Sequence, residues 1–203
     1  MPIIKWLARS QIFRPLLTWV SRLLSQPSEI DEPCDCLPLE IPDEALIARA
    51  VFFDSHVTPT DRLKWQLFKP PVERDDLSVM RLACVPPTDC KRRAKAMIGQ
   101  GRSYRGFAVM RTGSIRSEGA KVRDSREGNF CGHGDILLGV KRPRTLEGEP
   151  GSEQDQLDTY RYKAICKELL KHCNYVIDPE PNTNEWPAHV LLIGFDNEHP
   201  PIK

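Results

Sequence analysis

The clearest pattern along the chain is a series of short runs in which apolar residues dominate or alternate with polar ones. Such runs predict β-strands, and they lie at residues 49–54 (RAVFFD), 77–83 (LSVMRLA), 105–111 (RGFAVMR), 135–140 (DILLGV) and 189–195 (HVLLIGF). The last two runs are continuously apolar, which is typical of central strands buried on both faces. The pattern therefore predicts a sheet of about five strands.

Two longer stretches have helical spacing instead. Residues 88–98 follow two prolines and begin at Thr88, whose hydroxyl group suits a helix N-cap. Residues 155–173 carry apolar side chains at roughly helical intervals and end in basic ones, which favour the carboxyl end of a helix. Strands and helices together predict an α+β fold, a single domain over residues 49–203 with a mixed sheet and two main helices. Residues 143–154 (PRTLEGEPGSEQ) are expected to form a mobile loop within it.

The N-terminal part of the chain has a different character. Residues 1–26 contain four basic and no acidic side chains, and their apolar residues largely follow helical spacing. This predicts a basic, amphipathic helical segment that is kinked or divided at Pro15. The segment packs on the domain, docks on a partner protein or lies on a membrane surface. The side chains expected to make a partner or membrane contact are Trp6, Leu7, Phe13, Leu16 and Trp19.

Residues 27–48 are acidic and contain prolines, which predicts a linker. Cys34 and Cys36 within it have no matching pair at zinc-finger spacing, so neither a metal ion nor another cofactor is expected. The chain has 7 cysteines at irregular spacing, which favours reduced thiols and a cytoplasmic location over a secreted disulfide scaffold. No apolar run reaches about 18 residues, so any membrane contact is expected to be peripheral, through the N-terminal segment.

Composition adds one clue, the segregation of charge. The 203 residues have an ordinary globular composition and a net charge of +1. Residues 91–126, however, contain 11 Lys and Arg residues against Glu118 and Asp124. This stretch predicts a basic face that binds nucleic acid, meets an acidic partner or docks on the acidic residues 28–44 of the same chain. Its candidate contact residues are Arg92, Arg93, Arg102, Tyr104, Arg105, Arg111 and Arg116.

Polar residues among glycines lead into the fourth apolar run, at residues 129–135 (NFCGHGD). Here His133 is a candidate base, Asp135 could orient it or bind a cation, and Cys131 is a candidate nucleophile. The alternative is a tight turn whose side chains bond nearby backbone amides. Residues 54–56 (DSH) are expected to form a turn as well, because a serine adjacent to a histidine in sequence is not a catalytic pair.

Three segments carry a further pattern, made of Arg62, Leu63, Lys64, Phe68, Leu77, Ser78, Val79, Arg81, Asn129, His133, Asp135 and Ile136. Over residues 50–140 the chain thereby resembles small uncharacterised bacterial proteins with R-L-K-x-x-x-F, L-S-V-x-R and N-x-x-x-H-A-D-I segments, with Gly134 in place of the alanine. These proteins are associated with multi-gene bacterial conflict (defence) systems, in which small proteins accompany a larger effector. The resemblance implies an accessory role and assigns no catalytic residue.

These observations support three hypotheses about function. The first is a non-catalytic accessory subunit that docks on a larger protein, in a bacterial multi-gene defence system as the resemblance implies. The second is a nucleic-acid-binding protein that uses residues 91–126. The third is an enzyme with its site at residues 129–135, which is disfavoured because the chain has no phosphate loop, GxSxG or HExxH motif.

Deletion of residues 1–26 tests the first hypothesis. If the segment docks on a partner, the truncated protein should keep its melting temperature but lose that partner. Co-purification of the tagged full-length and truncated proteins from the native host, followed by mass spectrometry, measures the loss. A truncated protein that unfolds would instead show that the segment belongs to the core.

Overall fold

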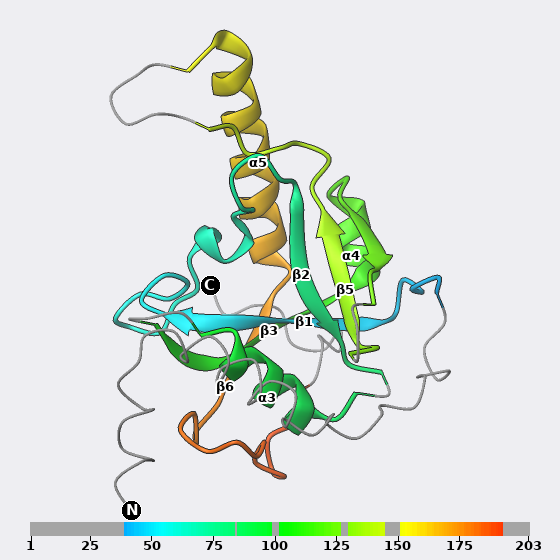
Figure 1. Ribbon diagram of the computed structural model, residues 1–203, viewed down its shortest axis with the longest axis vertical. Helices are drawn as coiled ribbons and strands as arrows, with labels where there is room; N and C mark the ends of the chain where they lie inside the picture. Colours follow the sequence, from blue (N-terminus) through cyan, green and yellow to red (C-terminus); the bar gives the residue numbers. More distant parts are fainter. Residues whose placement is uncertain (1–38, 84, 99–101, 127–129, 145–150, 193–203) are drawn as a thin grey trace, which may run out of the picture. The chain divides into compact units, whose positions relative to one another are not determined.

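The computed structural model describes residues 39–83, 85–98, 102–126, 130–144 and 151–192. Contacts divide the chain into two units, Met1–Pro33 and Cys34–Lys203, and all described residues belong to the second. Within it, six strands form one sheet in the order β4-β5-β2-β1-β3-β6 (Figure 1). The strands are β1 (Leu46–Phe53), β2 (Asp76–Arg81), β3 (Ser103–Arg111), β4 (Lys121–Asp124), β5 (His133–Leu137) and β6 (Asn174–Ile177).

Helices follow or connect these strands. They are the 3-10 helix η1 (Trp65–Phe68) and the α-helices α3 (Pro87–Ala96), α4 (Thr112–Ser117) and α5 (Glu153–Lys171). A capping box starts α5, because the Ser152 side chain accepts from the Asp155 backbone N–H while the Asp155 carboxylate accepts from that of Ser152. None of the described helices combines the length and the apolar character needed to cross a membrane.

The α+β class is confirmed, and α3 and α5 are the two long helices expected from the sequence. The sheet differs in detail, because it has six strands and each pairing between them is antiparallel rather than mixed. The expected strands did not include β4 and β6, which have four residues each. Of the expected strand at 189–195, residues 189–192 form no strand, and residues 193–195 lie outside the described part.

The sheet separates two apolar cores, and β1 contributes to both. Ile47 and Val51 of β1 face a core that includes residues of α5 and η1. Ala48 and Phe52 face a second core that includes residues of α3. Because side chains alternate between the faces of a strand, a strand with a core on each side must be apolar almost throughout. Arg49 is the one charged residue in β1.

Residues 178–190, which follow β6, contact α3 and are held there by Lys91 (Figure 1). The Lys91 side chain is fully buried, and its Nζ lies 2.8 Å from a carboxylate oxygen of Asp178. Three more oxygens lie within 3.0 Å of Nζ, the carbonyls of Glu180 and Glu185 and the hydroxyl of Thr183. A buried charge is tolerated when it is paired and hydrogen-bonded, so this cluster fixes the segment on the helix.

The folded unit begins before residue 49, the boundary expected from the sequence. Ile41 is 2% exposed and packs in the core that includes α5. Asp43 forms an ion pair with Arg116 of α4. The end of the expected linker, 27–48, is therefore part of the domain, and the expected contact between basic and acidic residues of the same chain is found for this pair. Likewise, α5 begins inside the expected loop 143–154.

Replacing Lys91 with methionine tests the role of the buried cluster. Lys91→Met leaves the Asp178 carboxylate buried without its partner, so the free energy of unfolding should fall by about 3–5 kcal/mol. Arg92→Met is the matched control, because Arg92 forms an exposed pair with Glu185 and should contribute less than about 1 kcal/mol. Urea unfolding followed by circular dichroism measures both. Equal effects of the two substitutions would show that the cluster is not what holds the segment.

Candidate ligand-binding cleft

A cleft opens in the sheet because β1 and β2 stay paired over a short distance. Two residue pairs join them, Ile47 with Arg81 and Ala48 with Met80, whereas eight pairs join β1 to β3. Beyond Ala48 the two strands run in different directions (Figure 1). Residues of both strands line a pocket of about 280 Å³ there. This volume lies near the lower end of small-molecule sites, which are typically about 300–1,000 Å³.

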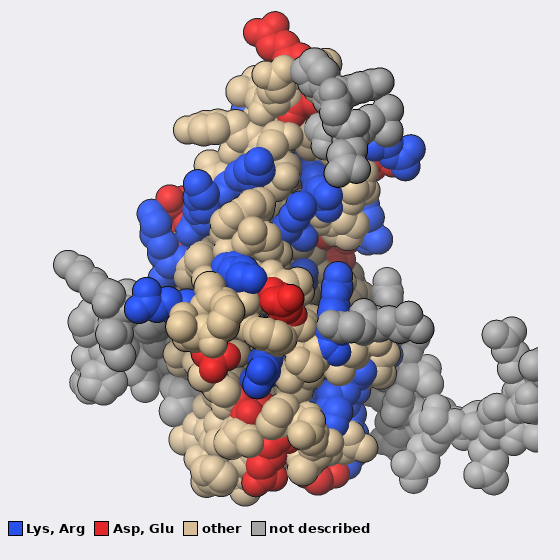
Figure 2. Space-filling view, turned by 90° about the vertical axis from the view of Figure 1, so that its left-hand side faces the viewer, with Lys and Arg blue, Asp and Glu red and all other residues tan. Residues whose placement is uncertain are grey.

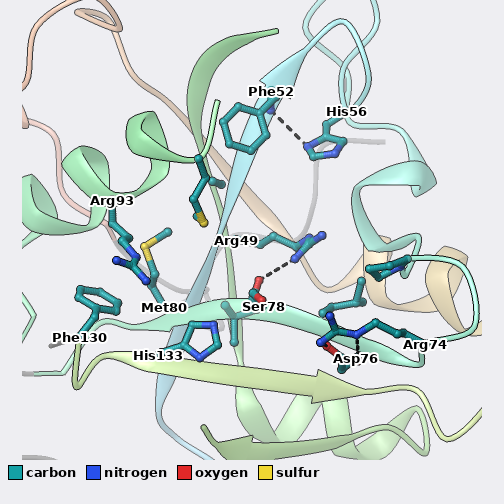
Figure 3. Close-up of a pocket in the computed structure, with 15 residues that line it drawn as sticks. Arg49, Phe52, His56, Arg74, Asp76, Ser78, Met80, Arg93, Phe130 and His133 are labelled. Atoms are coloured by element: carbon teal, nitrogen blue, oxygen red, sulfur yellow. Dashed lines mark hydrogen bonds and ion pairs between the residues drawn. The ribbon is translucent and has the colours of Figure 1, made fainter. Parts of the chain in front are cut away.

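Arg49 lies in the middle of the cleft and bridges its two sides (Figure 3). Its Nε donates a hydrogen bond to the carbonyl oxygen of Leu67 and its Nη1 donates one to that of Ser78, both at 2.6 Å. Among the described residues no carboxylate forms an ion pair with Arg49, and its Nη2 has no hydrogen-bond partner. Burial lowers the pKa of the guanidinium group to about 10, which leaves it charged at pH 7. The cleft therefore contains a half-buried cation without an ion-pair partner.

His56, in the turn after β1, adds a neutral group. Its Nδ1 accepts a hydrogen bond from the Phe52 backbone N–H at 3.3 Å. Burial, followed by the charges of Arg49 and Arg102, lowers the pKa of His56 to about 4. A hydrogen bond to the Ala50 backbone raises the pKa by less than these effects lower it, so the imidazole is neutral at pH 7. The turn expected at residues 54–56 is present, since the His56 N–H donates to the Phe52 carbonyl at 2.9 Å, and it also brings the ring to the cleft.

His133 of β5 lines the cleft as well, in an orientation set by its neighbour. Its Nδ1 lies 2.7 Å from the carbonyl oxygen of Ser125 and therefore carries the proton, which leaves Nε2 as an acceptor. Asp135 does not line the cleft, since it is 5% exposed and pairs with Arg123 at 3.3 Å. Cys131 is not part of the lining either. The structure thus brings one of the three candidate catalytic residues to the cleft.

Two further arginines line opposite ends of the cleft (Figure 3). At one end, the guanidinium group of Arg93 lies over the Phe130 ring, 5.5 Å from its centroid. At the other end, Nε of Arg74 lies 2.8 Å from Oδ1 of Asp76, and hydrogen bonding to Arg74 lowers the pKa of the Asp76 carboxyl group. Asp76 is the one acidic residue of the lining. Arg74 neutralises this carboxylate, so the positive charges of Arg49 and Arg93 have no matching carboxylate in the lining.

The candidate contact residues of the basic stretch 91–126 have different environments in the described part of the chain. Tyr104 is 3% exposed in the core beside α3, so it cannot stack on a nucleotide, contrary to the prediction. Arg93 is the one candidate of this stretch that lines the cleft. The others have separate environments: Arg92 pairs with Glu185, Arg116 pairs with Asp43, Arg105 lies over the Phe53 ring, Arg102 is exposed, and Arg111 is half-buried at the end of β3.

The docking candidates in residues 1–26, and Asn129, lie outside the described residues, and the predictions about them stand untested.

A second group of basic side chains lies beside the rim of the cleft. Lys69 follows η1 and precedes the rim residues Pro71 and Arg74. Burial, followed by the nearby charges of Arg142 and Lys163, lowers the pKa of Lys69. Figure 2 views this side of the protein, and in its upper half Lys and Arg side chains cover more of the surface than Asp and Glu side chains do. Such a surface attracts anions, and the rim brings it next to the cleft.

Arg49, His56 and Arg74 are not among the site residues predicted from the sequence. For Arg49 a signal exists, because an arginine within an apolar stretch such as residues 46–53 (LIARAVFF) is costly to bury and calls for a partner or a ligand. No comparable signal marks His56 or Arg74. Both lie in connecting segments, and only the fold places them next to the two diverging strands.

Within the described residues, no three His, Cys, Asp or Glu side chains are grouped as ligands for a metal ion. Comparison of the chain with protein-family models, curated proteins and solved structures finds no match. The resemblance to bacterial accessory proteins therefore remains a prediction. Function is inferred from the residues of the cleft.

The low pKa of His56 predicts how stability depends on pH. The imidazole has an ordinary pKa near 6.5 in the unfolded chain and about 4 in the fold, so the unfolded state binds more protons between these values. The free energy of unfolding should therefore fall as the pH drops through this range, and His56→Gln should lose that part of the dependence. Urea unfolding of both proteins across the range measures it. Identical pH profiles would contradict the burial of a neutral His56.

Proposed function

We propose that the cleft binds a small anionic ligand and that the chain acts by recognising this ligand. The observation that carries the proposal is the environment of Arg49. Its guanidinium group is half-buried and charged, it is held by two carbonyl oxygens, and its Nη2 is free among the described residues. Because removing a charge from water is costly without a counter-ion, a bound anion is the partner that this arrangement favours.

The groups around Arg49 support an anion rather than a cation. Arg93 adds a positive charge at one end of the cleft, and the one lining carboxylate, Asp76, is already bound by Arg74. The neutral His56 adds a polar but uncharged side chain to the lining. Hydrogen bonds that involve an ionised partner are roughly twice as strong as neutral ones, and partial burial strengthens them further.

The lining supports recognition more than catalysis. A covalent reaction through the protein needs a nucleophile next to a base. Ser78 lines the cleft, but no hydrogen bond joins its hydroxyl group to His56 or His133. No cysteine is among the described residues that line the cleft. A ligand-recognising chain of this kind agrees with the accessory role proposed from the sequence.

Binding of inorganic pyrophosphate by titration calorimetry at low ionic strength tests the proposal. Arg49→Lys keeps the charge but removes the planar fork, so affinity should fall by roughly tenfold, in line with the worth of a charge-assisted hydrogen bond. Arg93→Gln lies at the exposed rim, should leave the fold intact and should weaken binding by a few fold.

Arg92→Gln is the matched control, because this neighbouring arginine points to Glu185 and does not line the cleft. It should bind pyrophosphate like the unmodified protein. Equal weakening by Arg92→Gln and Arg93→Gln would indicate general electrostatic attraction, and an absence of binding by the unmodified protein would remove the proposal.

A further inference from the structure

We infer that the anion recognised by the cleft is a nucleotide, with its phosphate at Arg49 and its base on the apolar half of the lining. This inference rests on the proposed function and specifies the ligand of that same site. It depends on three features of the cleft, which are the division of its lining into two halves, the flat surfaces in the apolar half and the neutral polar groups between the halves.

The lining has a more polar and a more apolar half, with Arg49 in the middle between them. His56 and Arg74 lie in the first half in Figure 3, together with Phe52, whereas Met80 and Phe130 lie in the second, together with Arg93. A bare inorganic anion would use the first half and leave the second empty. The ligand that fills both has an anionic group joined to a larger, weakly polar body.

The apolar half presents surfaces suited to a flat ring. The Arg93 guanidinium group lies over the Phe130 ring, and two methionines, Met80 and Met97, also belong to the lining. Aromatic rings, guanidinium planes and thioethers are the surfaces on which nucleic-acid bases stack or pack. Met97 is 52% exposed, so its side chain is accessible to a ligand in the cleft.

Neutral polar groups argue against a fatty-acid anion, which has a charged end and a featureless apolar body. His133 presents an acceptor at Nε2, because Nδ1 is committed to Ser125. Ser78 offers an exposed hydroxyl group on the neighbouring strand. Donors and acceptors placed between a cation and an apolar wall match the hydroxyl groups of a sugar and the polar edge of a base. A volume of about 280 Å³ favours a small ligand over a larger one such as a dinucleotide.

The experiment compares nucleoside monophosphates with their two parts. The full-length protein is titrated with AMP, GMP, CMP and UMP, with the parent nucleosides and with inorganic phosphate, by calorimetry under one buffer condition. At least one monophosphate should bind ten-fold or more tightly than both its nucleoside and phosphate. A short oligonucleotide that competes with it would identify a strand as the source of the nucleotide unit, and failure to compete would identify the free nucleotide.

Two phenylalanines provide a matched pair of variants. Phe130→Ala should lower the affinity for the monophosphate by roughly 5-fold to 100-fold, the range expected for one stacked base. It should leave the affinity for inorganic phosphate unchanged. Phe53→Ala is the control, because Phe53 also lies under an arginine, Arg105 at 5.0 Å, but does not line the cleft.

The outcomes separate this inference from the function on which it rests. If phosphate and the monophosphates bind equally, and Phe130→Ala has no effect, the cleft is an anion site and the nucleotide inference is overturned. If neither phosphate nor any monophosphate binds, the proposed function itself fails. Equal weakening by Phe130→Ala and Phe53→Ala would also overturn the inference, because it would indicate a loss of stability rather than of stacking.

Discussion

The buried ammonium group of Lys91 is the interaction on which the described fold depends. It ties α3 to residues 178–190, and Trp186 of that segment packs against Phe107 of β3 with ring centroids 5.5 Å apart. These contacts close one of the two apolar cores and fix the position of α3 on the sheet. Because α3 supplies Arg93 to the cleft, a structural ion pair also determines one wall of the ligand site.

A second cation, the half-buried Arg49, has the opposite character, and the contrast supports a functional role for it. Lys91 has a carboxylate and three further oxygens around one ammonium group, so both its charge and its donors are used. Arg49 has two carbonyl partners, no carboxylate among the described residues and a free Nη2. Folding alone explains the first arrangement, since it holds two parts of the chain together. The Arg49 side chain also ties β2 and η1 to β1, but its positive charge is left for a bound anion to neutralise.

The sequence predicts the elements whose hydrophobic pattern is long and regular, namely β1, β2, β3, β5, α3 and α5. It fails for β6, whose four residues have no pattern of their own, and for Tyr104. A register shift between Val51 and Phe52 of β1 places Tyr104 on the same face as Phe107, against the simple alternation of the strand. Gly106 allows this bulge, because a side chain there would collide with the Val176 carbonyl of β6. Contacts of this kind between distant strands are set by tertiary packing and leave no local signal.

The candidate site shows the same limit at three consecutive positions of α3. Lys91, Arg92 and Arg93 look equivalent in sequence, yet one is buried in an ion pair, one forms an exposed pair with Glu185, and one lines the cleft. Successive helical residues point about 100° apart, so each of the three meets a different part of the fold. Consecutive basic residues in the sequence therefore need not form one basic surface in the fold. Reversing the charge of all residues at 91–126 would break the Lys91 cluster as well as the cleft, so only single substitutions can separate folding from ligand recognition.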